Sequence, residues 1–289
     1  MLYFIGTGLT PDSLSLRALK IIKSCDTIFL DAYTSILVSF EQMKELLEET
    51  LENREIQQAD RKLIETEEYK ILDPARDRNV ALLVVGDAMC ATTHSDLYLR
   101  AVKQGIQVKV IPNASIINSI AASGVEIYKV GRTISVPFFD ENIRPASFVD
   151  KIVQNYNMGL HSLMLMDIKT KEMNIKAYIK GVERYDPPRY MLSNLCAKQI
   201  VEVLNEKKFE SKFNIDSLAV ALMRVGTDAE KYLCAPIKTM AMLPDEIMGE
   251  PLHSVLVLGN DISDMEAQMF NLFAYDDETK QILKNFMLD

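Results

Sequence analysis

The alternation of apolar and polar positions is clearest between residues 80 and 105. An apolar run rich in β-branched residues, 80–85, predicts a buried strand, although a run this short also fits a helix. Gly86 ends the run, and Asp87 follows at its carboxyl end. Residues 93–96, Thr-His-Ser-Asp, fit a capping box, in which a hydroxyl and an acid three residues later begin a helix. The apolar positions Leu97, Leu99 and Val102 and the stop at Gly105 predict a helix after it.

The first half of the chain repeats this strand-then-helix pattern. Besides 80–85, strands are predicted at residues 2–5, 26–31 and 107–111, and helices at 39–50 and 59–72. A further helix, capped by Asp12 or Ser13, is predicted to carry Leu16, Leu19, Ile22 and Lys23. Such alternation predicts a mostly parallel sheet with helices on both faces. Ligands of open α/β sheets bind at the carboxyl ends of the strands, so residues 86–93 are the first candidate site. An ordinary strand-to-helix connection is the alternative.

The second half is less regular but has the same two element types. Strands are predicted at residues 134–139, 162–168, 218–225 and 253–258, and helices at 190–205 and 263–273. The mixture predicts a second α/β domain with some antiparallel pairing. We place the N-terminal α/β domain at residues 1–112 and the C-terminal one at 113–289.

Composition narrows the class of protein. The 289 residues are 48% hydrophobic and 25% charged, as in ordinary globular proteins, and the net charge of −9 argues against a surface built throughout for nucleic acid. The four cysteines, which show no C-x-x-C spacing, favour reduced thiols in the cytoplasm. The N-terminus lacks the pattern of a signal peptide, and no run is long enough for a transmembrane helix.

Isolated motifs carry little functional signal. Gly6-x-Gly8 after a strand, with Asp31 ending the next strand, partly matches a dinucleotide-binding loop, but Pro11 stands where the third glycine belongs. No phosphate-binding P-loop or nucleophile elbow is present. The three histidines, His94, His161 and His253, lack metal-binding spacing. Each is expected to be structural.

Longer segments resemble a known family. The opening F-I-G-T-G-L-T-P-D-S-L-S-L-R-A-L is similar to the tetrapyrrole methylase superfamily, and GDAMCATTHSDL, residues 86–97, resembles the G-D-x-x-x-A-T-T-H-x-D-L signature of diphthine synthases. Further matching segments follow in the family's order at residues 113–116, 144–148, 165–169, 187–191, 224–226 and 251–254. The resemblance therefore covers nearly the whole chain, and its N-A-S-I and P-P-R-Y-M forms are similar to the eukaryotic branch.

The resemblance implies a fold, a cofactor and a substrate. It implies a homodimer of chains with two α/β domains, with S-adenosyl-L-methionine in the cleft between the domains. The implied substrate is the modified histidine of translation elongation factor 2 in diphthamide biosynthesis, methylated three times on its amine and once on its carboxylate. The implied cofactor contacts, some of them through the backbone, are Leu9, Asp87, Cys90, Ser115, Ile116, Met166, Val225 and His253.

Four positions depart from the family pattern and affect the wall of the pocket: Ala88, Met89, Pro112 and Phe139. Methyl transfer from a sulfonium needs positioning of a neutral amine rather than a nucleophilic side chain or a metal, and the sequence identifies no general base. Three alternatives stay open: a tetrapyrrole methyltransferase, a nicotinamide-dependent oxidoreductase, and a noncatalytic partner of the translation machinery.

Overall fold

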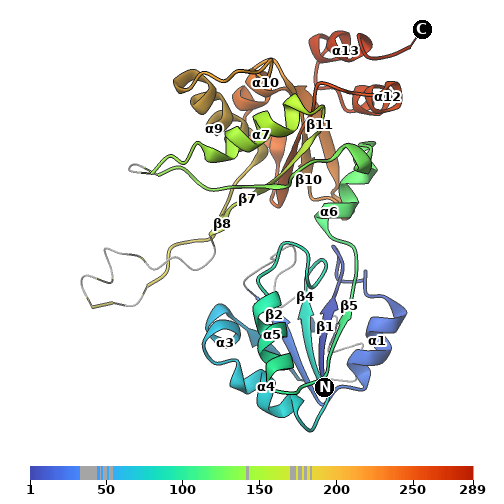
Figure 1. The fold of residues 1–289 in the computed structure, drawn as a ribbon, viewed down its shortest axis with the longest axis vertical. Helices are drawn as coiled ribbons and strands as arrows, with labels where there is room; N and C mark the ends of the chain where they lie inside the picture. The colour runs from blue at the N-terminus through green and yellow to red at the C-terminus, as the bar shows by residue number, and fades with distance from the viewer. Residues whose placement is uncertain are drawn as a thin grey trace. The chain divides into compact units, whose positions relative to one another are not determined.

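The computed structural model describes residues 1–32, 44–45, 47, 51, 55–140, 143–169, 174, 178, 181–182 and 184–288. The chain forms two compact units, Met1–Ser119 (unit 1) and Ile120–Asp289 (unit 2), each with its own sheet (Figure 1). The sequence prediction ended the first domain at residue 112, whereas residues 113–119 lie in unit 1. Asn113 explains this difference, because its amide nitrogen donates to the carbonyl oxygens of Gly6 and Ser13. Both units are α/β, as predicted.

Unit 1 contains a five-stranded parallel sheet. Its strand order is β3 (Ile56–Ala59), β2 (Thr27–Asp31), β4 (Val80–Val84), β1 (Leu2–Gly6), β5 (Val108–Ile111). Every residue of β4 is buried, which confirms the strand predicted from the apolar run. The core residues show that α3 (Arg61–Glu65), α4 (Tyr69–Ala75) and α5 (Ser95–Lys103) pack on one face and α1 (Leu16–Lys23) on the other (Figure 1).

Two local predictions for unit 1 are wrong. The single helix predicted at 59–72 is instead the end of β3 followed by α3 and α4, because the Asp60 carboxylate accepts from the Leu63 amide and starts α3 there. The capping box predicted at residues 93–96 is not placed at the start of α5, because the N-cap residue is His94, which has helical angles and makes no side-chain capping hydrogen bond. The predicted helix at 39–50 falls mostly outside the described residues.

Unit 2 contains a mixed five-stranded sheet, which confirms the predicted antiparallel pairing. Its strand order is β11 (Lys231–Pro236), β10 (Leu218–Met223), β12 (His253–Val257), β7 (Ser162–Met166), β6 (Ile134–Val136), and only the β6–β7 pair is parallel. The strand predicted at 162–168 breaks after Met166, and the short strand β8 (Ile168–Lys169) pairs with β9 (Arg189–Tyr190). The sequence analysis did not predict β11.

Helices cover the sheet of unit 2. The helices α7 (Ser147–Asn157), α9 (Ser193–Glu206) and α10 (Ile237–Met242) share one core cluster with alternate residues of the strands. The remaining helical segments are η1 (Ile120–Ser123), η2 (Ile127–Lys129), α11 (Asp245–Met248), α12 (Asp264–Leu272) and α13 (Asp277–Lys284), and unit 1 ends with α6 (Ile116–Ser119).

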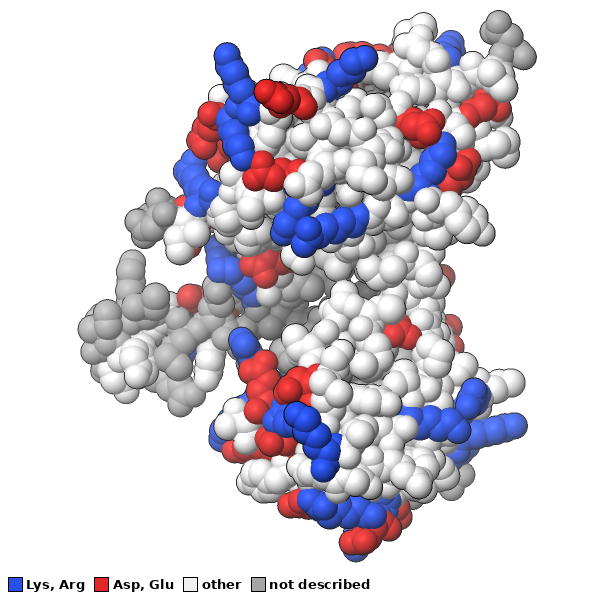
Figure 2. Space-filling model, in the orientation of Figure 1, with Lys and Arg blue, Asp and Glu red and all other residues white. Residues whose placement is uncertain are grey.

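On the face drawn in Figure 2, acidic and basic side chains are interspersed over both units. Within the part of the chain that the structure describes, no helix is long and apolar enough to cross a lipid bilayer.

Candidate functional site

The carboxyl ends of β1 and β4 form the centre of unit 1. The chain leaves β1 toward β2 on one side and leaves β4 toward β5 on the other, so these neighbours mark the topological switch point where α/β sheets bind ligands. Gly8 and Gly86 follow these two strands and exchange main-chain hydrogen bonds, Gly8 N to Gly86 O at 3.0 Å and Gly86 N to Gly8 O at 2.8 Å. The loops after β1 and β4 are thus joined to each other by main-chain hydrogen bonds.

Close backbone approach explains the glycines of the first loop. A Cβ atom on Gly6 would lie 2.6 Å from the Gly86 oxygen, and Gly8 has a φ of +84°. Asp31, the acid of the dinucleotide hypothesis, is 3% exposed, and its Oδ2 lies 3.3 Å from Nε2 of the fully buried His94. Gly6 and Gly8 therefore allow the loops after β1 and β4 to approach closely. Asp31 is directed into the protein rather than at a ribose.

Asp87 organises the loop after β4 through its own main chain. One carboxylate oxygen accepts from the amides of Met89 at 2.9 Å and Cys90 at 3.1 Å, and the other accepts from the Asn113 amide at 3.0 Å. Burial alone would raise the pKa of Asp87, but these amide hydrogen bonds hold it below its usual range. The carboxylate is therefore charged at neutral pH and is largely occupied by backbone donors.

Asn113 belongs to the loops of this candidate site, although it was not singled out from the sequence. Its side-chain nitrogen donates to the carbonyl oxygens of Gly6 and Ser13, both at 3.0 Å, while its side-chain oxygen accepts from Ala114 N at 2.8 Å. With the bond from its own amide to Asp87, Asn113 connects the loops after β1, β4 and β5. Its place two residues after a predicted strand was the available signal.

The other predicted residues of unit 1 lie on these same loops. Cys90 is an exposed residue with a partly buried thiol. This partial burial and the nearby Asp87 charge raise the pKa of the thiol, so it is not a reactive thiolate. Ser115 is buried, and its hydroxyl accepts from Ile117 N at the start of α6, which also contains Ile116. Leu9, also buried, follows Gly8. Of the four departures, Ala88 is fully buried and Pro112 is exposed.

Unit 2 brings its three predicted residues to one edge of its sheet. His253 opens β12 and pairs with Met223, the last residue of β10, so Val225 lies just beyond it. In the antiparallel pairing of β12 with β7, Val255 lies opposite Met164, so Met166 at the end of β7 lies toward the start of β12, where His253 is. Met166, Val225 and His253 therefore come from neighbouring strands at the same edge.

His253 is a neutral side chain with both ring nitrogens occupied. Its Nδ1 accepts from Ser193 N at 3.3 Å, which leaves Nε2 to carry the proton and donate to the Glu250 carbonyl at 2.8 Å. Burial first, and then the neighbouring Arg224 charge, lower its pKa to about 4. A histidine in this state holds backbone in place and is not available as a general base near neutral pH.

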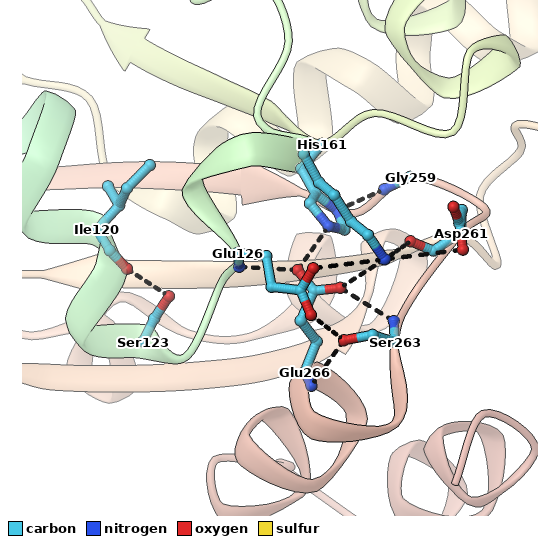
Figure 3. Close-up of polar contacts among 9 residues, drawn as sticks. Ile120, Ser123, Glu126, His161, Gly259, Asp261, Ser263 and Glu266 are labelled. Carbon is cyan, nitrogen blue, oxygen red and sulfur yellow. Dashed lines mark hydrogen bonds and ion pairs between the residues drawn. The ribbon is translucent and has the colours of Figure 1, made fainter.

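A second polar centre in unit 2 lies at the opposite edge of the sheet, where β7 starts and β12 ends (Figure 3). The buried Glu266 carboxylate accepts from His161 Nε2 and Glu126 N, both at 2.9 Å, and from Ser263 N at 3.0 Å, and it pairs with Lys129 at 3.4 Å. His161 Nδ1 accepts in turn from Gly259 N at 2.9 Å. We call the group Glu126, Lys129, His161, Ser263 and Glu266 the Glu266 clasp.

The clasp explains the local structure around α12. Ser263 and Glu266 form a capping box at the start of this helix, and the bond from Glu126 attaches the first segment of unit 2 to it. Burial would raise the pKa of Glu266, but the hydrogen bonds from His161, Ser263 and Glu126 lower it to about 2. His161, which was expected to be structural, has a structural role here as a hydrogen-bond partner of Glu266. Among the described residues, no three His, Cys, Asp or Glu side chains are grouped to hold a metal ion.

Comparison with known proteins gives consistent results. Residues 1–238 match the family model "Tetrapyrrole (Corrin/Porphyrin) Methylases". The chain is 43% identical to a diphthine methyl ester synthase of Schizosaccharomyces pombe, with 95% of this chain and 94% of the relative covered, and 40% identical to one of Homo sapiens, with 97% and 98% covered. A crystal structure of a putative diphthine synthase from Entamoeba histolytica is similar with a TM-score of 0.80, 37% identity, and 96% of this chain and 99% of that chain covered.

Proposed function

The chain belongs to the tetrapyrrole (corrin/porphyrin) methylases and, within them, to the diphthine methyl ester synthase family, and on that premise we propose its substrate, cofactor and site. It is a methyltransferase of diphthamide biosynthesis. We propose that S-adenosyl-L-methionine is the methyl donor and that the acceptor is the modified histidine of translation elongation factor 2. The relatives' shared name across nearly the full chain favours this acceptor over a tetrapyrrole.

The observation that best supports the cofactor is the connected pair of loops at the β1–β4 switch point. Five of the eight proposed contacts lie on or next to these loops or the α6 start bound to them: Leu9, Asp87, Cys90, Ser115 and Ile116. The other three, Met166, Val225 and His253, share one sheet edge in unit 2. None of the eight is a Lys or Arg and His253 is neutral, so the chemistry of this set suits a cofactor whose sulfonium is positive.

The residues would act by binding and orienting. The bound donor supplies an activated methyl group, so no covalent bond to the protein is needed. Asp87 and Asn113 fix the loop amides and carbonyls, and the buried Leu9 and Val225 exclude water from the groups they contact. Holding donor and acceptor in line provides several kcal/mol of the barrier, of the order of 7–11 in well-oriented cases. We assign no catalytic acid or base.

We propose four transfers, three to the amine and one to the neighbouring carboxylate. A carboxylate is a weaker and better solvated nucleophile than a free amine, so the ester step needs removal of water around it. Elongation factor 2 carrying the aminocarboxypropyl group, incubated with the enzyme and excess cofactor, should gain mass in methyl steps. Brief mild base should remove one of the four. No gain would contradict the function, and a limit of three base-stable methyls would contradict only the ester step.

We further propose a homodimer in the cytoplasm, the compartment of its proposed protein substrate. Exposed apolar side chains on α12, Met265 and Leu272, provide the kind of surface that a second chain covers, and most homo-oligomers are two-fold symmetric. Light scattering at micromolar concentration should give twice the mass of the chain. A monomer mass would contradict this proposal.

A further inference from the structure

Arg224 adopts an uncommon backbone conformation directly after β10. Its φ is +51°, in the left-handed region that glycine adopts readily and that costs other residues stability. Among the described non-glycine residues, only Arg224 and Ala91 have positive φ. Since glycine would avoid this cost, the presence of arginine indicates that its side chain has a use at this position.

The guanidinium group connects two segments of unit 2 through main-chain carbonyls. Arg224 Nε donates to the Ala229 oxygen at 2.9 Å, within the loop between β10 and β11. A terminal nitrogen donates to the Met248 oxygen at 3.2 Å and also to the Glu250 oxygen, both in the segment that leads to β12. The planar guanidinium suits this task because its donors point in fixed directions.

Both segments contain residues of the proposed cofactor site. Val225 is the next residue in the chain, and His253 Nε2 lies 3.4 Å from a terminal nitrogen of Arg224. His253 donates to the same Glu250 oxygen that Arg224 contacts. The main chain of Arg224 adds a fixed turn, with its amide donating to Leu252 O at 2.8 Å and its carbonyl accepting from Thr227 N at 3.1 Å.

We infer that Arg224 is a positioning residue for cofactor binding, which holds Val225 and His253 in place without being one of the proposed cofactor contacts. This inference rests on the proposed function. It assigns a role to a residue outside the eight proposed contacts. It also explains the left-handed turn, which places the arginine between the two segments that it joins.

Calorimetric titration with S-adenosylhomocysteine, the demethylated cofactor, tests the inference. Arg224→Gln should weaken binding about 10- to 100-fold, the range for losing hydrogen bonds to a charged group. The matched control is Arg76→Gln, because Arg76 also donates to a main-chain carbonyl, that of Gln104, but lies in unit 1 on the surface. Arg76→Gln should bind like the wild type. The KM for cofactor should rise in Arg224→Gln, with a smaller change in kcat.

Chemical rescue separates positioning from general stability. Arg224→Gly relieves the left-handed strain and removes the guanidinium, so added guanidinium chloride at low millimolar concentration should restore part of the lost affinity. Sodium chloride at the same ionic strength should not. Arg224→Lys, which retains the charge without the fork, should bind more weakly than the wild type and serves as the second variant if Arg224→Gln does not fold.

The outcomes are distinct. Wild-type affinity in folded Arg224→Gln, an equal loss in Arg76→Gln, or no specific rescue by guanidinium would overturn the role of Arg224. Failure of the wild type itself to bind S-adenosylhomocysteine would instead overturn the proposed function, and the role of Arg224 with it. Weakened binding in Arg224→Gln with normal binding in Arg76→Gln, together with rescue, would support the inference.

Discussion

The two units shape their strand-end loops with side chains of opposite charge. In unit 1, the Asp87 carboxylate gathers the amides of Met89, Cys90 and Asn113. In unit 2, the Arg224 guanidinium gathers carbonyls, including those of Ala229 and Met248. In both cases the partner of the charge is main chain rather than an opposite side-chain charge.

The difference lies in which backbone groups form hydrogen bonds with each charge. A buried or half-buried ion is tolerated because several hydrogen bonds satisfy it, and the loop receives a fixed shape in return. The carboxylate accepts from N–H groups, whereas the guanidinium donates to carbonyl groups. A charged residue in a signature can therefore act on a ligand indirectly, by setting the shape of the loop that touches it.

The largest expected effect comes from crowding the loop after β1, where Gly8 packs against Ser13. Gly8→Ala adds a Cβ that clashes with Ser13 and strains a φ of +84°, while the control Gly105→Ala adds strain at +76° with no atom within 4 Å. We expect Gly105→Ala to lower the free energy of unfolding by about 1 kcal/mol and Gly8→Ala by roughly 1–3 kcal/mol more. Urea unfolding followed by circular dichroism measures both, and equal losses would contradict the close packing of Gly8 against Ser13.

Acid should affect the Glu266 clasp next. The folded pKa of Glu266, about 2, is below the ordinary value of 4.5. Its contribution is therefore present above pH ~5 and is lost as the pH falls toward 2, and it amounts to about 3 kcal/mol at most. Hydrogen exchange of α12 amides should accelerate over this range.

In Glu266→Gln the acid-dependent part of this exchange should be largely absent. The control Glu202→Gln removes an exposed carboxylate whose surface pair with Arg144 contributes little. An unchanged acid response of α12 in Glu266→Gln would show that the clasp does not control this helix.

Removal of the Asp87 carboxylate should have a moderate effect on ligand binding. We expect Asp87→Ala to weaken binding of S-adenosylhomocysteine by roughly 1–3 kcal/mol, because the amides of Met89, Cys90 and Asn113 lose their acceptor. Asp96→Ala, in the same signature, removes an exposed carboxylate paired with Arg100 and should change little. Calorimetry on both folded variants provides the comparison, and normal affinity in Asp87→Ala would remove Asp87 from the site.

The smallest effect is the expected lack of a response at His253. Its pKa of about 4 lies below the ordinary 6.5, so the folded protein keeps this ring neutral from pH 8 to about 5. The unfolded chain binds the proton first, so this residue makes the stability of unit 2 fall as pH drops from ~6.5 toward 4. A nitrogen-detected NMR titration should show the Nε2–H form throughout the upper range, and protonation near pH 6.5 would contradict the hydrogen-bond assignment.

Sequence predicted the strands whose side chains are apolar and buried, such as β4, β10 and β12. It missed β3, since Gln57 and Gln58 are exposed on this edge strand and leave no apolar pattern. A Thr-x-x-Asp pattern also could not show that the N-cap of α5 is His94 or that Asp96 pairs with Arg100, whereas a capping box lies at Ser263.

The loops of the candidate site were the part that the sequence predicted. Resemblance and strand ends pointed to residues 86–93, and the connected loops of unit 1 lie there. Asn113 and Arg224 were not singled out, because a polar loop side chain directed at main chain looks like any other in sequence. The hydrogen bond between His161 and Glu266 joins residues 105 positions apart in the sequence, so no local sequence pattern predicts it.

We propose that Asp87 acts on the ligand through the shape of its loop, and Asp87→Asn tests this role most directly. Asparagine can accept from the amides of Met89 and Cys90 but places an N–H group against the Asn113 amide. Affinity for S-adenosylhomocysteine should be measured beside hydrogen exchange at Asn113. We predict that affinity and protection of this amide fall together. Lost affinity with full protection, or full affinity with lost protection, would contradict the claim.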